Sequence, residues 1–335
     1  MTDTSIDLSL VLPTLGNHDR LGRSLPGLCE ALVALEALRG RAGSTEIVVV
    51  DDSGDGSATA ALPEILASLG GEPRGVAIRT VGTERNLGFG PAVMRGARDA
   101  RGAHLLVLHD DVLLEGAGMS ALLEVMEGEP AIFAAAPSLR RSPEPGAAPV
   151  RVPARVVRLE DDWICVRDAR GGEEEASASA PVAGHALVDL EVIPSAAMLV
   201  RRGEFLDLGG FDRLFGPASL EDVDLSLCAR RRGRRLVAVL DADALHLDLG
   251  DGLGDLLGAP VARAVTARNR LLLRWKHLAT RTDAADHLVG LWRTALEAGL
   301  TGDRETLEGI ALAMDRLGEM AESRATLSGA APMDF

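Results

Sequence analysis

The chain contains no tyrosine, and only six phenylalanines and three tryptophans occur among its 335 residues. So few aromatic side chains argue against a platform on which successive nucleic-acid bases stack. Cysteine is scarce too. Cys29, Cys165 and Cys228 lie far apart, without the paired spacing of a zinc site or a disulfide framework. The sequence therefore predicts a reducing, cytoplasmic compartment.

Basic residues are outnumbered: 35 Lys and Arg stand against 50 Asp and Glu, for a formal net charge of -15 at pH 7. A protein that grips a nucleic-acid backbone needs a basic footprint, so we expect no nucleic-acid partner. A ligand that contains phosphate is not excluded, because a bound metal ion can make the local electrostatic potential positive in an acidic protein. No apolar run approaches the length of a membrane span, and Met1–Thr4 lacks the pattern of a signal peptide.

What remains is the composition of an ordinary globular protein, with 47% hydrophobic and 25% charged residues. Such a length suffices for one large domain, or for one domain with an appendage. Short apolar runs alternate with segments of helical spacing, and the runs lie at Leu8–Leu12, Ile47–Val50, Val76–Val81 and Leu105–Leu108. This β-α-β-α-β-α-β order predicts an α/β fold with a doubly wound, mostly parallel sheet flanked by helices.

Beyond residue 137 the pattern changes. Over residues 137–194, short β-like pieces such as 152–158 alternate with turn-rich stretches, which we interpret as an excursion at the sheet edge. The sheet pattern resumes at 195–200, so one domain is predicted for residues 1–253. From residue 254 to residue 335 the apolar spacing is helical, and we expect a helical C-terminal extension.

Paired carboxylates follow two of the predicted strands, Asp51-Asp52 after one and Asp110-Asp111 after the other. In open α/β sheets, ligands bind beyond the carboxyl ends of the strands. A carboxylate pair there can hold a hard divalent cation against a phosphate. The same residues also suit a polar turn after a buried strand, so each pair taken alone leaves both interpretations open.

Two further candidate groups occur later in the chain. Glu221 and Asp222 begin a predicted helix that runs to about Gly233, and His246 follows a predicted strand at Leu236–Leu240. A carboxylate can take a proton from a hydroxyl as a general base. Acidic residues also favour a helix N-terminus through its dipole, and a lone histidine is more often packed or exposed than a ligand.

Taken together and in this order, these stretches resemble the family-2 glycosyltransferases, which are inverting sugar-nucleotide enzymes of the GT-A fold. The nearest resemblance is to the rhamnosyltransferase-like and galactofuranosyltransferase-like members. The matching stretches are Leu10–Thr14, Glu46–Ser53, Asn86–Gly88, Leu108–Val112, Met198–Arg202, Gly209–Asp212 and Leu220–Leu227. As a set they are far more specific than any one motif.

The resemblance implies a role for each candidate residue. The residues that would contact the nucleoside, phosphates or sugar of the donor are Pro13, Thr14, Asp51, Asp52, Asn86, Gly88 and Asp110. Asp111 and His246 would ligate Mg²⁺ or Mn²⁺, since a zinc site would want more nitrogen or sulfur. Asp222 would be the catalytic base, with Glu221 as the alternative. His109 departs from the family pattern, because it stands where many members carry Asp.

The implied function is inverting, metal-dependent transfer of a sugar, of the hexosyltransferase type, in bacterial glycan or glycoconjugate biosynthesis. The donor would be a nucleoside-diphosphate sugar, and the acceptor a glycan, a lipid-linked molecule or a small molecule. One alternative is a nucleotidyltransferase, although the loop Pro13–Asn17 has a single glycine and no lysine where that class needs a basic phosphate loop. Another is a non-catalytic partner subunit of the same fold. The sequence leaves the oligomeric state open.

The first helix of the extension is basic, and its basic residues are Arg263, Arg268, Arg270, Arg274 and Lys276. It has two functional interpretations, closure over the donor diphosphate or docking on the anionic inner face of a membrane. The structural alternative, which we favour, is a solvated basic face on a packing helix.

Overall fold

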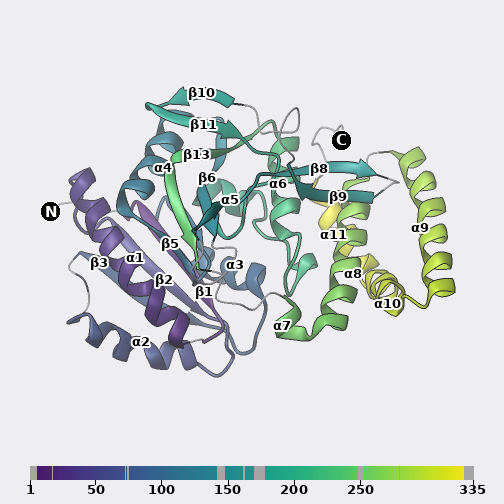
Figure 1. Cartoon of the computed structure of the whole chain (residues 1–335), viewed down its shortest axis with the longest axis horizontal. Helices are drawn as coiled ribbons and strands as arrows, with labels where there is room; N and C mark the ends of the chain where they lie inside the picture. The colour runs from purple at the N-terminus through teal and green to yellow at the C-terminus, as the bar shows by residue number, and fades with distance from the viewer. Residues whose placement is uncertain are drawn as a thin grey trace.

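The computed structural model describes residues 6–16, 18–71, 73, 75–141, 148–160, 163–169, 178–247, 253–278 and 280–327. Over these ranges the chain forms an 11-stranded mixed sheet, a two-stranded hairpin and helices on both faces of the sheet (Figure 1). A group of C-terminal helices packs at one side, away from the N-terminal strands (Figure 1). The predicted α/β architecture with a helical C-terminal part is confirmed.

The N-terminal half of the sheet is parallel throughout. Its strands are β1 (Leu8–Thr14), β2 (Thr45–Asp51), β3 (Val76–Gly82) and β4 (His104–Leu108), joined by α1 (His18–Arg39), α2 (Ser57–Ser68) and α3 (Phe89–Asp99). The spatial order is β4-β1-β2-β3. Because the order reverses between β1 and β4, the carboxyl ends of these two strands flank a crevice in which ligands of this fold bind.

Both faces of this half are covered, which explains its uninterrupted apolar strands. On β1, Leu10 faces a core built with α1, α2 and α4 (Gly116–Gly128), whereas the next residue, Val11, faces a second core on the opposite side. That second core contains residues of α3, of α5 (Arg202–Asp207) and of α6 (Glu221–Arg231). A buried strand between two helical layers therefore reads as a continuous apolar run.

The other half of the sheet is mixed. Its strands are β5 (Val112–Leu114), β6 (Ile132–Arg141), β7 (Val150–Arg151), β10 (Ala178–Val182), β11 (His185–Asp189), β12 (Ala197–Arg201) and β13 (Arg235–His246). β12 runs antiparallel between β4 and β6, and β13 runs parallel to β6. The predicted strand 236–240 is too short, because β13 continues to pair with β5 as far as His246↔Val112. This pairing brings His246 beside the end of β4.

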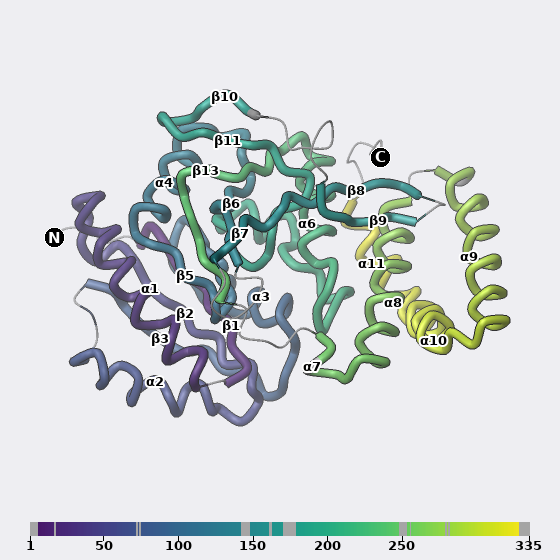
Figure 2. The backbone as a smooth tube through the Cα atoms, in the orientation of Figure 1, coloured from purple at the N-terminus to yellow at the C-terminus, as the bar shows by residue number. Residues whose placement is uncertain are grey.

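The excursion over 137–194 splits into two parts where it is described. β10 and β11 extend the sheet beyond β13, while β8 (Arg155–Glu160) and β9 (Trp163–Asp168) form a separate hairpin. Figures 1 and 2 show this hairpin reaching across to the C-terminal helices. The excursion therefore contributes both the edge of the sheet and a hairpin that packs beside α6.

The C-terminal helices are α7 (Leu253–Leu257), α8 (Ala259–His277), α9 (Arg281–Thr301), α10 (Arg304–Met314) and α11 (Leu317–Ala325). A third core joins α8 to α6 and to the β8–β9 hairpin. None of the helices in the part of the chain that the structure describes has the length and apolarity to cross a bilayer. The expected domain boundary at residue 253 stays a prediction.

The basic residues of α8 correct one expectation. Arg268, Arg274 and Lys276 are 8%, 2% and 3% exposed, so the favoured interpretation of a solvated basic face is wrong for them. Only Arg263 and Arg270 of the five are exposed. Burial of Lys276 is compensated by the carboxylates of Asp212 and Asp224, and Arg268 donates to the carbonyl oxygen of Gly216.

Candidate active site

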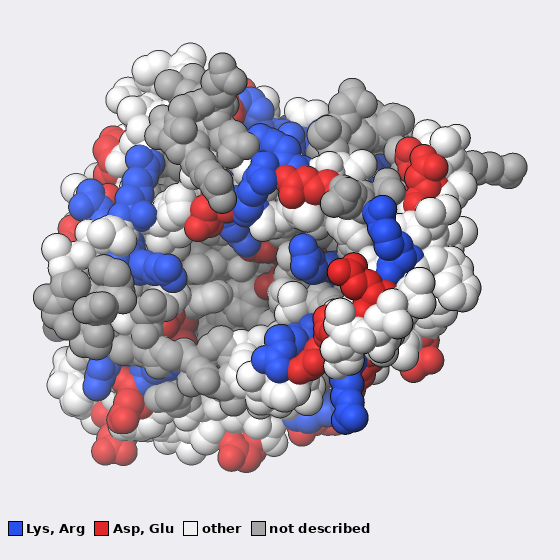
Figure 3. Space-filling model, turned by 45° about the vertical axis from the view of Figure 1, so that its right-hand side comes forward, with Lys and Arg blue, Asp and Glu red and all other residues white. Residues whose placement is uncertain are grey.

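A cavity of about 290 Å³ opens at the carboxyl ends of β1, β2 and β4. It gathers all of the predicted donor-contacting residues except Asp51, and those residues are Pro13, Thr14, Asp52, Asn86, Gly88 and Asp110. Its other walls include Arg20, His109, Ser195 and Glu221. We call this the donor cavity. The molecule as a whole is hollowed on one face, with basic side chains at several places around the hollow and acidic ones inside it (Figure 3).

Thr14 and Asp110 join the ends of β1 and β4. The Thr14 hydroxyl donates to Asp110 Oδ2 at 2.7 Å, and Arg20 Nη1 lies 3.6 Å from Asp110 Oδ1. Burial raises the pKa of Asp110, although the Thr14 hydroxyl and the Arg20 guanidinium oppose that rise. Arg20 places a guanidinium in the wall of the cavity, where its fork of donors suits a phosphate.

Asp52 holds the loop that contains Asn86 and Gly88. Its carboxylate accepts from the backbone N–H of Leu87 at 2.9 Å and of Gly88 at 2.8 Å, and from the Thr83 hydroxyl at 2.8 Å. Burial nevertheless raises its pKa. Gly88 has φ +90°, and a Cβ there would lie 2.0 Å from the carbonyl oxygen of Pro217, so only glycine fits this approach.

Asp51 has a different task. Its carboxylate accepts from the Ser53 hydroxyl at 2.5 Å and from the Thr59 backbone N–H at 2.7 Å, which ties the end of β2 to the first turns of α2. Burial opposes ionisation, but the hydrogen bonds from Ser53 and Thr59 prevail and lower the pKa of Asp51. Asp51 shapes the turn beside the cavity and is absent from the residues that line it.

His109, Asp111 and His246 form a cluster at the ends of β4 and β13. Their potential ligand atoms all lie within 4.8 Å of one another, and His246 Nε2 is 3.4 Å from Asp111 Oδ1. Desolvation by burial, opposed by the charges of Asp111 and Asp222, lowers the pKa of His109 to about 4. The ring is therefore neutral at pH 7, as a metal ligand must be. Two imidazoles and one carboxylate fit a transition-metal ion such as Mn²⁺ better than they fit Mg²⁺.

Glu221 and Asp222 open α6, but their surroundings differ. Glu221 lines the donor cavity and is 7% exposed, and its Oε2 has no hydrogen-bond partner among the described residues. Burial, reinforced by the charge of Asp222, raises the pKa of Glu221 to about 8. Asp222 instead forms an ion pair with Arg155 of β8, and the Ser195 hydroxyl lies 3.5 Å from its Oδ2.

The segment that leads into α6 is held by α8. Asn269 Nδ2 donates to the carbonyl oxygens of Phe215, Ala218 and Ser219 at 2.9, 3.0 and 2.9 Å. This support matters because Ser219 and Leu220 have φ values of 88° and 70°, which non-glycine residues adopt at a cost. The C-terminal extension therefore helps to fix the position of Glu221 and Asp222.

A second group of similar residues lies deeper, between α6 and α8. Asp224, Cys228 and His277 also bring their potential ligand atoms within 4.8 Å, and all three are buried. Lys276 Nζ donates to Asp224 Oδ2 at 2.7 Å and to Asp212 Oδ2 at 2.8 Å, while His277 Nε2 lies 2.8 Å from Asp224 Oδ1. A protein cation therefore already compensates the carboxylate.

Sequence reasoning missed four residues of this region. Arg20, Arg155 and Ser195 stand alone in the sequence without a motif, so their roles depend on which elements fold beside them. His109 carried a signal, since it directly precedes two carboxylates at a strand end, but we treated it as a departure from a pattern rather than as a ligand.

Comparisons with known proteins found one family model and several solved structures that resemble this chain. The Glycosyl transferase family 2 model matches residues 9–158, a little under half of the chain. No curated protein matches the chain significantly. Among solved structures, GalNAc-T7 with UDP, GalNAc and Mn²⁺ has a TM-score of 0.54 at 16% identity, covering 81% of this chain but only 48% of that one.

Two other structures resemble the chain over more of their own length. The mannosyltransferase PcManGT from Pyrobaculum calidifontis, with GDP-Man and Mn²⁺, has a TM-score of 0.50 at 15% identity, covering 97% of this chain and 86% of that one. S. aureus TarS 1-349, with UDP-GlcNAc, has a TM-score of 0.57 at 12% identity, covering 95% of this chain and 81% of that one. At such identities these likenesses establish the fold. With the family match over 9–158, they identify a glycosyltransferase domain of the GT-A fold in this chain.

Proposed function

We propose that this protein transfers a sugar from a nucleoside-diphosphate sugar to an acceptor hydroxyl with inversion at the anomeric carbon. The observation that carries the proposal is the convergence of the donor cavity, the His109–Asp111–His246 cluster and the Glu221–Asp222 pair at one end of the sheet. In the reaction, the acceptor oxygen bonds to the anomeric carbon. The bond from that carbon to the diphosphate breaks, and its electron pair leaves with the nucleoside diphosphate.

Asp222 is the proposed general base. The acceptor hydroxyl loses its proton as it attacks, and a carboxylate must take that proton. The ion pair with Arg155 holds Asp222 in a fixed position, and Ser195 lies between its carboxylate and the donor cavity. Loss of a general base costs about a hundredfold to ten-thousandfold in rate.

Glu221 has a different proposed role. Since burial and the charge of Asp222 raise its pKa to about 8, its carboxyl group is mostly protonated at pH 7. A protonated carboxyl in the donor cavity can donate a hydrogen bond to a donor oxygen, and its Oε2 has no partner among the described residues. Glu221→Gln keeps a neutral donor, so it is expected to retain far more transfer activity than Asp222→Asn.

The metal site is proposed to comprise Asp111, His246 and also His109, since the ligand atoms of all three lie within 4.8 Å. A bound Mn²⁺ or Mg²⁺ supplies Lewis-acid stabilisation of the charge on the departing diphosphate. The two imidazoles make Mn²⁺ the favoured ion. Two of the solved structures with a similar fold contain Mn²⁺, which is consistent with this choice.

The donor is tested first, by thermal unfolding with individual nucleoside diphosphates in the presence and absence of Mn²⁺. A ligand that binds only the native state raises its melting temperature, so we expect one base to give a metal-dependent rise. Slow release of nucleoside diphosphate from the matching sugar nucleotide then separates sugar transfer from its alternatives. Pyrophosphate formation would indicate a nucleotidyltransferase, and neither product would indicate a non-catalytic subunit.

The base is tested by Asp222→Asn. This variant should bind nucleoside diphosphate with wild-type affinity and lose transfer by about a hundredfold or more. Retained turnover would assign the base elsewhere. The bacterial glycan context, the peripheral membrane contact and the cytoplasmic location stay predictions of the sequence.

A further inference from the structure

A second cavity of about 360 Å³ is lined by Arg155, the ion-pair partner of Asp222. Its floor is formed by β6, and its walls come from the segment around β7 and β8 and from the chain between β11 and β12. Arg155, which pairs with Asp222, lines this cavity, and Pro194 lines it while the next residue, Ser195, lines the donor cavity. Asp222 itself lines neither cavity, but it contacts one wall residue of each, Arg155 of the second cavity and Ser195 of the donor cavity.

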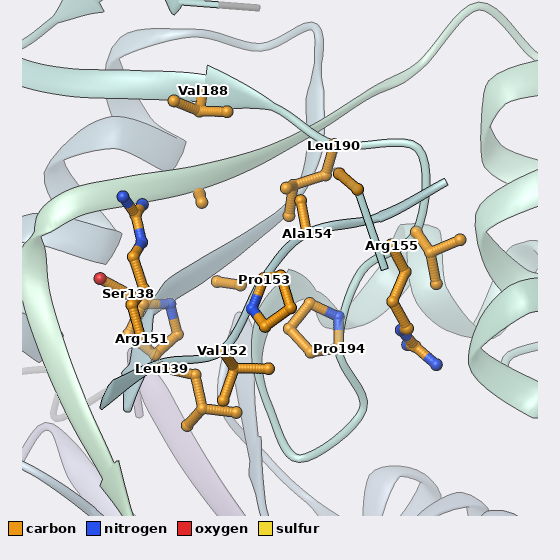
Figure 4. A pocket seen from close by; sticks show the side chains of 15 residues that line it. Ser138, Leu139, Arg151, Val152, Pro153, Ala154, Arg155, Val188, Leu190 and Pro194 are labelled. Carbon is orange, nitrogen blue, oxygen red and sulfur yellow. The ribbon is translucent and has the colours of Figure 1, made fainter. Parts of the chain in front are cut away.

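The second cavity is mainly apolar and carries a positive charge. Val152, Pro153, Leu190 and Pro194 point into it (Figure 4). Arg151 and Arg155 lie at opposite sides, with the rings of Pro153 and Pro194 between them (Figure 4). The two guanidinium groups are therefore separated by an apolar surface.

The two arginines differ in what they already contact. Arg155 is committed to Asp222. Arg151 is exposed, and it makes no ion pair with any carboxylate in the part of the chain that the structure describes. Arg140, its partner in the β6–β7 register, pairs with Asp243 at 3.1 Å. In a chain of net charge -15, a cation without a carboxylate partner beside an apolar cavity favours an anionic ligand.

We propose that this cavity binds the acceptor, and that the acceptor is an alcohol with an apolar group and an anionic group. This inference rests on the proposed function for its catalytic step. The apolar part lies against Val152, Pro153 and Pro194, and the anionic group meets Arg151. The reacting hydroxyl then faces Arg155 and Asp222, so that its proton passes to the Asp222 carboxylate as its oxygen bonds to the anomeric carbon.

The proposal is tested by direct binding, without donor, of three matched probes below their micelle-forming concentrations. Octyl β-glucuronide carries both an apolar chain and a carboxylate, octyl β-glucoside lacks the carboxylate, and methyl β-glucuronide lacks the chain. Each buried methylene is worth roughly 0.8 kcal/mol, or about fourfold in affinity, so octyl β-glucuronide should bind at least tenfold more tightly than either other probe.

Arg151→Gln should weaken the binding of octyl β-glucuronide by about tenfold or more and leave that of octyl β-glucoside unchanged. Arg140→Gln, which removes an adjacent arginine that already has a partner, is the matched control and should change neither. Equal binding of octyl glucoside and octyl glucuronide would overturn the proposal, as would an Arg151→Gln variant with wild-type affinity.

A failure of the proposed function would look different. If octyl β-glucuronide binds in the Arg151-dependent way but no nucleoside diphosphate binds or is released, the cavity stands as an anion-selective apolar site and sugar transfer is overturned. If donor binding and release occur and the Arg151 dependence is absent, sugar transfer stands and this assignment of the acceptor is wrong.

Discussion

Two clusters in this protein bring potential metal-ligating atoms within 4.8 Å of one another, and they differ in composition and in depth. His109, Asp111 and His246 meet at the ends of two strands beside a cavity. Asp224, Cys228 and His277 meet between two helices, and there Lys276 already donates to the carboxylate at 2.7 Å. Ligand atoms within reach of one another therefore do not define a metal site. In the deeper cluster the protein itself supplies a cation, Lys276, which occupies the carboxylate that a metal ion would need.

The pKa values in the deeper cluster reflect the nearby lysine and the burial of the site. Burial opposes ionisation of Asp224, but Lys276 and His277 prevail and lower its pKa. Burial raises the pKa of the Cys228 thiol, so it is a poor source of the thiolate that a metal ion requires. We infer that the deeper cluster fastens α8 to α6 and that the one beside the cavity is available for catalysis.

The largest expected effect is on stability, from Lys276→Met. It leaves Asp224 buried without its cation, which costs about 3–5 kcal/mol of unfolding free energy. Urea denaturation measures this cost. The control is Arg263→Met, which removes a solvent-screened ion pair with Glu305 at the surface and should cost far less. Equal costs for the two variants would show that Lys276 does not neutralise the deeper cluster.

The next effect concerns the Mn²⁺ complex of a nucleoside diphosphate, which as a single ligand at about a hundred times its dissociation constant should stabilise the wild type by about 2.7 kcal/mol. Asp111→Ala should abolish the metal-dependent part of this stabilisation. Cys228→Ser, in the deeper cluster, should retain it in full. Thermal unfolding with and without metal measures both variants, and a metal response that survives Asp111→Ala would remove Asp111 from the site.

A smaller effect follows from His109→Asp, which replaces one imidazole of the cluster with a carboxylate. Because carboxylate oxygens suit Mg²⁺ and imidazoles suit transition metals, the ratio of Mg²⁺ to Mn²⁺ affinity should rise by about tenfold. Titration of each ion in the presence of nucleoside diphosphate gives the ratio. An unchanged ratio would exclude His109 as a ligand.

The smallest effect extends the comparison to Glu221, a buried carboxyl group at the start of α6 without a paired cation among the described residues. Its pKa rises from 4.5 to about 8 on folding, so the native state binds the extra proton and stability is lost as pH rises through this range. Between pH 6 and pH 7 the wild type should lose about 1 kcal/mol relative to Glu221→Gln. Parallel pH profiles for the two proteins would contradict the raised pKa.

The linear sequence determined the elements and much of the site. Apolar runs such as Ile47–Val50 and the helical spacing between them predict the parallel half of the sheet, because a strand covered on both faces must be apolar throughout. The carboxylates at the strand ends follow from the same pattern. Six of the seven residues predicted to contact the donor line one cavity, and their contact with a donor stays a prediction.

Only the tertiary structure decided how those side chains are used. Asp51 and Asp52 are adjacent in sequence, yet one fastens α2 while the other holds the loop of the donor cavity, because successive side chains at a strand end point in different directions. The sequence predicted Lys276 on a solvated face, but the packing of α8 against α6 buries it beside Asp224. The pairing of Arg155 with Asp222, 67 residues apart, also depends on which elements fold side by side. Local pattern sets which residues are buried, but long-range packing sets which charges meet.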